Sequence, residues 1–173
     1  MALLVLLSFD VYLRPGEGLT LKAKNLDDYV PDKTGVFNNS LPLDHPRTQK
    51  WLGRALEKLK KGKKENDLLF NVEAEKYRKA FESAGAWLGL PGLRTYQLRH
   101  GGAADDLLTK TREYAAVKDR GRWRTDSSVR RYGKVGKVQT LLNKMPRWAL
   151  DYCRRAEASM EAVLSGSKNP LSQ

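Results

Sequence analysis

Cysteine and histidine are scarce in this sequence, which contains one cysteine, Cys153, and two histidines among 173 residues. A single cysteine excludes an internal disulfide, and the lack of a cysteine–histidine cluster argues against a structural zinc site. The sequence also carries no cofactor-binding motif. We therefore expect no metal and no cofactor, and we expect Cys153 to be a small packed residue within a helix.

Long hydrophobic runs are also lacking. The apolar stretch at the N-terminus, Met1–Phe9, is too short to cross a bilayer and is followed directly by Asp10. It has neither the basic start nor the small-residue cleavage site of a signal peptide. We interpret it as part of a buried helix over residues 2–13, and we expect an intracellular protein that does not enter a membrane.

Acidic residues are outnumbered, 20 against 32 lysines and arginines, which gives a formal net charge of +12. Such an excess favours an acidic partner, most commonly nucleic acid, although a merely solvated basic surface is the alternative. Two separated basic clusters would grip a phosphate backbone from two sides. The residues nominated for DNA binding are Lys58, Lys60, Lys61, Lys63, Lys64, Arg122, Arg124, Arg130 and Arg131.

Apolar periodicity predicts a chain dominated by helices. Pro15 disfavours helical geometry at Arg14, which would end the first helix, and Pro15 then suits the start of a short second one. Asn71 is a natural N-cap for the helix after it. The further helices are expected over residues 47–61, 72–88, 95–108, 111–117, 127–132 and 147–164.

Between the early helices, the pattern changes to short extended segments. Leu19 and Leu21 would start one strand, Tyr29 and Val30 would continue the sheet, and Val36–Leu43 would return after a turn. We therefore predict an α+β protein that is mostly α-helical and has a small antiparallel β-sheet of two or three strands.

The last third of the chain holds the candidate chemistry. Arg99 follows Leu98, which suggests that its side chain is drawn inward, where a guanidinium needs an anionic partner. The small residues Gly101–Ala104 would let another backbone pack against that helix. Trp123 comes later, and Tyr132 follows it by nine residues.

These residues, together with two earlier motifs, resemble the catalytic domain of the tyrosine recombinases, also called phage-type integrases. The first box of that family, an arginine with an acid three residues on, is similar to Arg14–Leu21. The family's lysine turn is similar to Asp32-Lys33-Thr34-Gly35, which precedes Leu41-Pro42-Leu43. The second box is similar to Tyr96–Ala103, with Tyr96 at the usual histidine position.

The resemblance implies attack by the Tyr132 hydroxyl on a DNA phosphorus, which gives a 3′-phosphotyrosyl link and a free 5′-hydroxyl. Arg14 and Arg99 would hold the nonbridging oxygens, and Lys33 would protonate the leaving oxygen. Trp123 would donate its indole N–H to the phosphate; a register one residue earlier would place Arg122 there instead. The implied catalytic residues are Arg14, Lys33, Tyr96, Arg99, Trp123 and Tyr132, with Glu17 and His100 in support.

The resemblance also implies an overall organisation. Residues 1–145 would form a catalytic domain with the fold of DNA breaking-rejoining enzymes, without the family's N-terminal DNA clamp domain. Residues 146–165 would form a C-terminal helix that partners can exchange, and residues 166–173 a disordered tail. The expected partner is double-stranded DNA, bound by a homo-tetramer, in the nucleoid or the nucleus.

Two other interpretations stay open. One is a DNA-binding relic of a mobile element that keeps the fold without catalytic turnover. The other is a basic helical protein that binds RNA or serves as a scaffold. The last predicts that Arg14, Lys33, Arg99 and Tyr132 do not converge in space.

Overall fold

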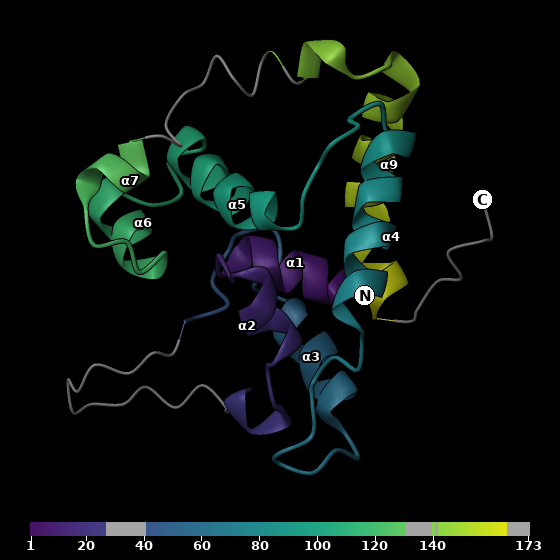
Figure 1. Ribbon diagram of the computed structural model, residues 1–173, viewed down its shortest axis with the longest axis vertical. Coiled ribbons are helices and arrows are strands. Elements are labelled where there is room, and N and C mark those ends of the chain that lie inside the picture. Colours follow the sequence, from purple (N-terminus) through teal and green to yellow (C-terminus); the bar gives the residue numbers. More distant parts are fainter. Residues whose placement is uncertain (27–40, 131–139, 141, 166–173) are drawn as a thin grey trace.

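The computed structural model describes residues 1–26, 41–130, 140 and 142–165. Helices dominate this part of the chain (Figure 1). The α-helices are α1 (Ala2–Asp10), α2 (Pro15–Leu19), α3 (Leu52–Lys60), α4 (Ala74–Trp87), α5 (Tyr96–Leu108), α6 (Tyr114–Arg120), α7 (Asp126–Arg130) and α9 (Arg147–Leu164), and a 3-10 helix, η1, covers Ala23–Asn25.

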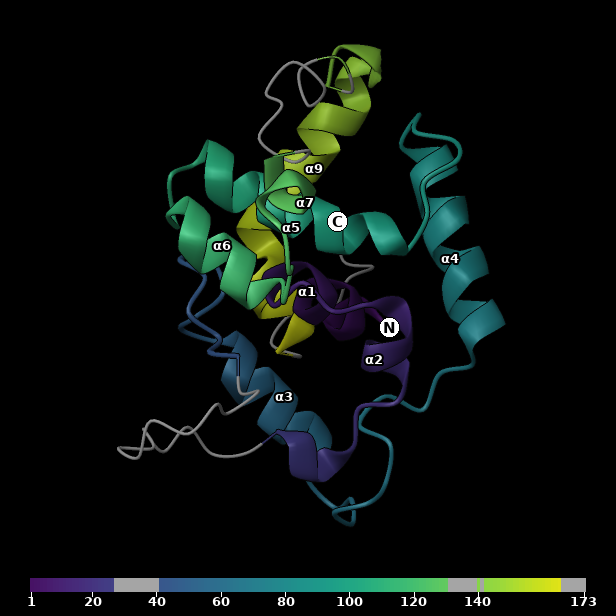
Figure 2. The ribbon, with the colours of Figure 1, turned by 60° about the vertical axis from the view of Figure 1, so that its left-hand side comes forward.

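Helix α1 lies at the centre, with α5 across it, α3 on another side and α6 and α7 beyond α5 (Figures 1 and 2). One core cluster joins α1 to α3 and to the chain before α4, through buried residues such as Leu4, Leu56 and Phe70. A smaller cluster joins the end of α1 to α5, α6 and α7 and includes Tyr12 and Ala103. The candidate site lies over this smaller cluster.

Close packing of α5 on α1 depends on a glycine. A Cβ atom built on Gly102 would lie 2.0 Å from the Phe9 carbonyl oxygen and 2.9 Å from the Tyr12 ring. A Cβ on Gly101 would lie 3.2 Å from the Phe9 ring. The expectation that the small residues after Arg99 admit another backbone is therefore confirmed.

Helix α1 ends at Asp10, three residues before Leu13, the predicted last residue of this helix. Tyr12 adopts a left-handed backbone conformation with φ of +52°, and the Leu13 N–H donates to the Ser8 carbonyl at 3.1 Å, as in a Schellman cap. The buried Tyr12 hydroxyl donates to Asp106 of α5. Tertiary packing therefore ends α1 before the influence of Pro15 reaches it.

The predicted sheet is wrong for the described residues, which contain no strand. Leu19 ends α2 instead of starting a strand, because Pro15 and Glu17 begin a helix that includes it. The extended chain that follows makes one isolated antiparallel bridge, between Lys22 and Leu68. The described fold is therefore mostly α-helical rather than α+β; the predicted turn with Lys33 lies outside the described residues.

Three other helix starts differ from prediction. Helix α6 covers Tyr114–Arg120 instead of residues 111–117, and Glu113 is its N-cap. Helix α3 begins at Leu52 instead of residue 47, because the Thr48 hydroxyl donates to buried Asp10 at 2.7 Å and the preceding residues form turns. Helix α4 begins after Glu73, so Asn71 is not its N-cap. Helix α9 has the predicted bounds, and Cys153 lies within it, half-buried.

None of the described helices combines the length and the apolar character that a crossing of the bilayer requires.

Candidate functional site

Arg99 lies at the centre of the candidate site, with only 1% of its surface exposed. One guanidinium nitrogen donates to the carbonyl of Tyr12, and the other donates to the carbonyl of Gly121. These carbonyls belong to the caps that end α1 and α6, where the partial negative charge of a helix gathers. Arg99 therefore bonds to two backbone carbonyls in the described residues, rather than to a protein carboxylate, and a substrate phosphate stays the other partner expected for it.

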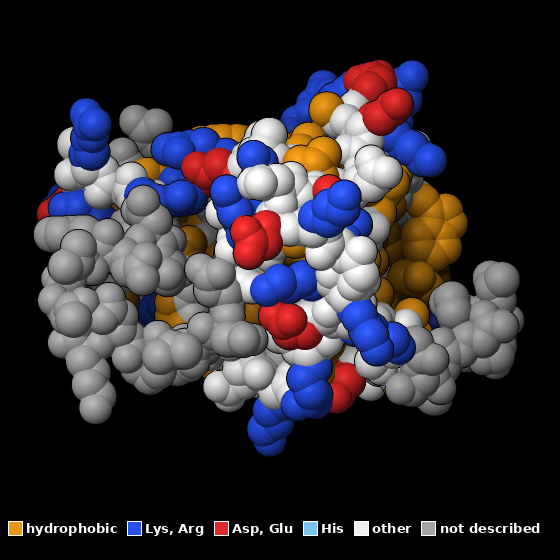
Figure 3. All heavy atoms as spheres, turned by 90° about the horizontal axis from the view of Figure 1, so that it is seen from below, with side chains coloured by type: hydrophobic (Ala, Val, Ile, Leu, Met, Phe, Trp, Pro, Cys, Tyr) orange, Lys and Arg blue, Asp and Glu red, His pale blue; other side chains and the backbone are white. Residues whose placement is uncertain are grey.

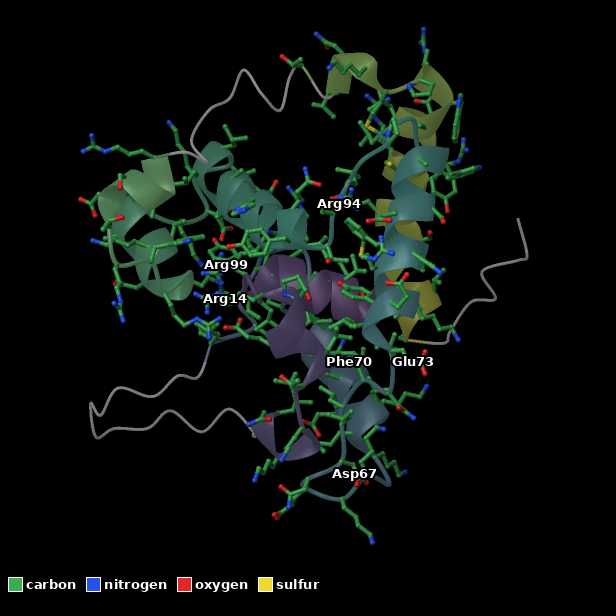
Figure 4. All side chains as sticks on the ribbon, in the orientation of Figure 1. Arg14, Asp67, Phe70, Glu73, Arg94 and Arg99 are labelled. Carbon is green, nitrogen blue, oxygen red and sulfur yellow. The ribbon has the colours of Figure 1, made fainter. Side chains whose placement is uncertain are left out.

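The pKa of Arg99 reflects its burial and the charged side chains around it. Burial lowers the pKa of its guanidinium, and the positive charges of Arg14 and Arg122 lower it further. Glu17 acts in the opposite direction. Arg14 and Arg99, which are 85 positions apart in the sequence, therefore lie close together, as Figure 4 shows at the junction of α2 and α5. The Nε atom of Arg99 has no hydrogen-bond partner among the described residues.

Glu17 links the two exposed arginines of the site. Its Oε1 atom accepts from Arg14 Nη1 at 2.9 Å, and its Oε2 atom accepts from Arg122 Nη2 at 2.7 Å and from the Arg14 backbone N–H at 2.8 Å. Partial burial alone would raise the pKa of Glu17, but the Arg14 amide and the Arg122 guanidinium together hold it below its ordinary value. The carboxylate therefore stays ionised between two guanidinium groups.

Trp123 packs inward against the same cluster. The Arg99 guanidinium carbon lies 4.8 Å from the centre of its ring, a cation–π contact, and the Tyr12 ring lies 5.9 Å away. A Cβ atom on Gly121 would lie 1.9 Å from the Trp123 ring. Gly121 therefore makes room for this indole.

Tyr96 and His100 lie one turn apart on α5, with ring centres 4.6 Å apart and nearly perpendicular rings. Tyr96 is exposed, whereas burial and the charge of Arg99 lower the pKa of His100. His100 is therefore a neutral side chain near neutral pH. Tyr96 is the exposed hydroxyl at this edge of the site.

The lysine cluster divides into two groups. Lys58 is exposed and donates to the Ser165 carbonyl at 3.0 Å, and half-buried Lys60 donates to the Leu26 carbonyl at 2.6 Å, so both amino groups bond to the backbone. Lys61 and Lys64 are exposed, and Lys63 is half-buried, around the turn after α3. The chain after α3 lies at the lower end of the molecule, and Arg14 and Arg99 lie near its middle, beside α1 (Figures 1 and 4).

The remaining predicted residues lie near α7 or outside the described part of the chain. Arg124 and Arg130 are exposed on the segment from α6 to α7. Lys33, Arg131 and Tyr132 lie outside the described residues, so the position of the proposed nucleophile relative to the arginines is not described.

A buried polar network beneath the site is the largest feature that the sequence did not reveal. Arg112 bridges Asp106 and Asp44, and Arg120 donates to the Asp10 carbonyl at 3.0 Å. The Nε2 atom of buried His45 lies 3.3 Å from Oδ2 of Asp105. Asp105 and Asp106, adjacent acids near the end of α5, are the sequence signal for this network. Carboxylates on a helix whose other residues are packed require cationic partners. Among the described residues, no group of three or more acidic, histidine or cysteine side chains is arranged to hold a metal ion.

A second surface that the sequence did not reveal is aromatic. Trp87 of α4 and Trp148 and Tyr152 of α9 are all about half exposed, and the rings of Trp148 and Tyr152 lie 4.8 and 4.9 Å from that of Trp87. Tyr152 also lines an apolar groove that lies between α1, α4 and α9. Viewed from the α3 end, the molecule has lysines, arginines and carboxylates across its face and a hydrophobic area at the α4–α9 side (Figure 3).

Comparisons with protein-family models, with curated proteins and with solved structures found no match for this chain.

Proposed function

We propose that this protein binds double-stranded DNA and cleaves and rejoins its strands through a phosphotyrosine, as tyrosine recombinases do. The observation that carries the proposal is the cluster of Arg14, Arg99 and Arg122 around one carboxylate, Glu17. Three guanidinium groups and one carboxylate leave an excess of positive charge at a partly exposed surface. A DNA phosphate matches that charge and the planar donor geometry.

The three arginines support the proposal in different ways. The side chains of Arg14 and Arg122 are 53% and 35% exposed, so they can reach a bound phosphate directly. Arg99 is buried directly beneath and adds its charge to the site while it fixes the ends of α1 and α6. The proximity of Arg14 and Arg99 favours a phosphate site over the scaffold interpretation, which predicts that these side chains lie apart.

In the proposed reaction, the Tyr132 hydroxyl gives up its proton to water while its oxygen attacks a phosphorus, and a bond forms between that oxygen and phosphorus. The bond from phosphorus to the 5′ oxygen breaks, and Lys33 protonates the departing oxygen. Arg14 stabilises the charge that develops on the nonbridging oxygens. Rejoining is the same sequence in reverse, with a 5′-hydroxyl as the attacking group. Assembly as a homo-tetramer on two DNA sites belongs to the same proposal.

The test uses duplex DNA with a nick beside a randomised region, so that a cleaved strand end diffuses away and traps the covalent intermediate. We expect wild-type protein to form an adduct that survives denaturation, and we expect Tyr132→Phe and Arg14→Ala to form none. Tyr152→Phe, which removes an exposed hydroxyl on α9, should retain it. Binding without an adduct in wild-type protein would contradict the proposed reaction and favour a DNA-binding relic.

A further inference from the structure

We propose that Arg122, and not the indole of Trp123, is the side chain that α6 contributes to a bound phosphate. The inference rests on the proposed function, because it assumes that a phosphodiester binds beside Arg14. It changes the identity of one ligand group: a charged planar guanidinium takes the position that the nine-residue interval to Tyr132 assigned to a neutral ring N–H.

The backbone at the end of α6 separates the two side chains. Arg122 N–H donates to the Asp119 carbonyl at 2.9 Å and Trp123 N–H donates to the Lys118 carbonyl at 3.1 Å, the two bonds of a Schellman cap. Arg122 is the left-handed residue of this cap, with φ of +53°. Within this cap, Trp123 contacts Arg99 and Gly121, whereas Arg122 reaches Glu17 of α2.

Trp123 is committed to packing. Its ring contacts the buried guanidinium of Arg99 and covers Gly121, and the half-buried indole lies beside the Tyr12 ring. The Trp123 ring is thus held against buried Arg99, whereas the Arg122 guanidinium lies at Glu17 beside Arg14. The cation–π contact holds the charge of Arg99 in place, so the structure favours a supporting role for Trp123.

Arg122 is placed where a phosphate oxygen would bind. It and Arg14 hold opposite oxygens of one carboxylate, at 2.7 and 2.9 Å. The two nonbridging oxygens of a phosphodiester present a similar pair of acceptors. A guanidinium has five N–H donors, so the bond to Glu17 leaves donors of Arg122 for a second anion. Glu17 thus fixes the spacing of the two arginines.

The left-handed conformation of Arg122 directs its side chain. Helices usually place glycine at this cap position, because a side chain there is strained. Tyr12 and Lys110 adopt the same conformation, with φ of +52° and +55°. The conformation therefore accounts for the direction of the Arg122 side chain toward Glu17, and the support for a phosphate ligand comes from the position of the guanidinium.

The strain also supplies a variant that separates folding from binding. Arg122→Gly removes the guanidinium and relieves the backbone, so we expect it to unfold at a higher urea concentration than wild type. Trp123→Phe keeps a ring over Gly121 but lacks an N–H donor. Arg78→Ala is the matched control, because Arg78 is 42% exposed, pairs with glutamates on α4 and lies outside the site.

The experiment titrates inorganic phosphate at constant ionic strength and follows the arginine Nε–H signals by NMR. We expect phosphate to shift the Arg14 and Arg122 signals of wild-type protein. Arg122→Gly should bind phosphate about tenfold more weakly, the effect of one charge-assisted hydrogen bond. Trp123→Phe should bind within about twofold of wild type, because it removes no proposed ligand, and Arg78→Ala should be unchanged.

Full phosphate affinity in Arg122→Gly, loss of affinity in a folded Trp123→Phe protein, or no phosphate binding by wild type would overturn the inference. The proposed function has a separate test in the nicked-DNA adduct. An adduct that forms equally in Arg122→Gly leaves the function standing and rejects Arg122. Phosphate binding through Arg122 without any adduct rejects strand cleavage and keeps this site.

Discussion

At position 102, the fold admits no side chain. A Cβ atom there would lie 2.0 Å from the Phe9 carbonyl oxygen, and backbone cannot move aside as a flexible side chain can. We expect Gly102→Ala to lower the free energy of unfolding by at least about 1–3 kcal/mol, because it overpacks the α1–α5 contact.

The matched control for that substitution is Gly53→Ala in α3, where nothing lies within 4 Å of the built Cβ atom. Alanine is the better helix former, so this change should stabilise the protein by up to about 1 kcal/mol. Urea unfolding of both variants measures the difference. Equal effects at positions 102 and 53 would contradict the described packing of α5 on α1.

Glu17 gives a prediction about pH. Its pKa in the folded protein lies below the ordinary value of 4.5, so its ionised form contributes stability above that pH. The contribution is lost as the pH falls through the lower folded pKa. We expect the free-energy difference between wild type and Glu17→Gln to be constant above about pH 6 and to shrink below the ordinary pKa.

Unfolding of both proteins at a series of pH values measures this dependence. Arg14 and Arg122 remain charged throughout that range, so the titration reports the carboxylate. A difference that grows toward acidic pH would mean that Glu17 is not held between the two arginines.

At the scale of helices, Arg99 is the residue that joins elements. Its two guanidinium nitrogens bind the carbonyls at the ends of α1 and α6, while its backbone belongs to α5. A lysine carries the same charge but has no fork of donors. We expect Arg99→Lys to leave one buried carbonyl without its donor and to lower the free energy of unfolding by about 1–3 kcal/mol.

Arg94→Lys is the control for that substitution, because Arg94 is 64% exposed and makes a surface ion pair with Glu82. Its effect should stay within about 0.5 kcal/mol. Thermal or urea unfolding distinguishes the two outcomes. A change at Arg99 no larger than the change at Arg94 would mean that the guanidinium does not tie α1 and α6 together.

The helices were predictable from the sequence because their apolar periodicity is local, and α9 has the predicted bounds. Helix α1 ends early because Tyr12 bonds to Asp106, a contact across 94 positions that no local pattern reports. The sheet prediction was wrong where Pro15 and Glu17 start a helix that includes Leu19.

In the candidate site, too, local sequence patterns do not report contacts between residues that are far apart in the chain. Motif order nominated Arg14 and Arg99, and the inward position of Arg99 was predicted from its apolar neighbour Leu98. The sequence offers Arg122 as the alternative to Trp123 at the phosphate but cannot choose between them, because the choice depends on a left-handed backbone and on Glu17, 105 positions away. The need for glycine at position 121, which is contact with the Trp123 ring, also requires the structure.

For the whole molecule, the two basic regions predict a salt-dependent affinity for DNA. Replacing Lys61, Lys63 and Lys64 by alanine should weaken binding to all sequences. It should also reduce the slope of log affinity against log salt by about 0.9 for each DNA phosphate that the variant no longer neutralises. The control replaces three lysines outside both regions, Lys50, Lys76 and Lys79, and so has the same net charge.

Fluorescence anisotropy of labelled duplex DNA over a range of salt concentrations measures both slopes. If the slope falls as much in the control triple variant as in the variant of the lysines after α3, the binding depends on net charge alone. The turn around Gly62 would then have no particular role at the DNA backbone.

The proposed reaction attaches DNA covalently to Tyr132. Mass spectrometry of the trapped DNA adduct is the most direct test of that claim. Trypsin cleaves after Arg131 and after Lys134, so the tyrosine lies in the short peptide Tyr132-Gly133-Lys134. We predict a nucleotide attached to that peptide through a 3′-phosphotyrosine. A nucleotide attached to any other residue, or no adduct with the nicked DNA pool, would contradict the claim.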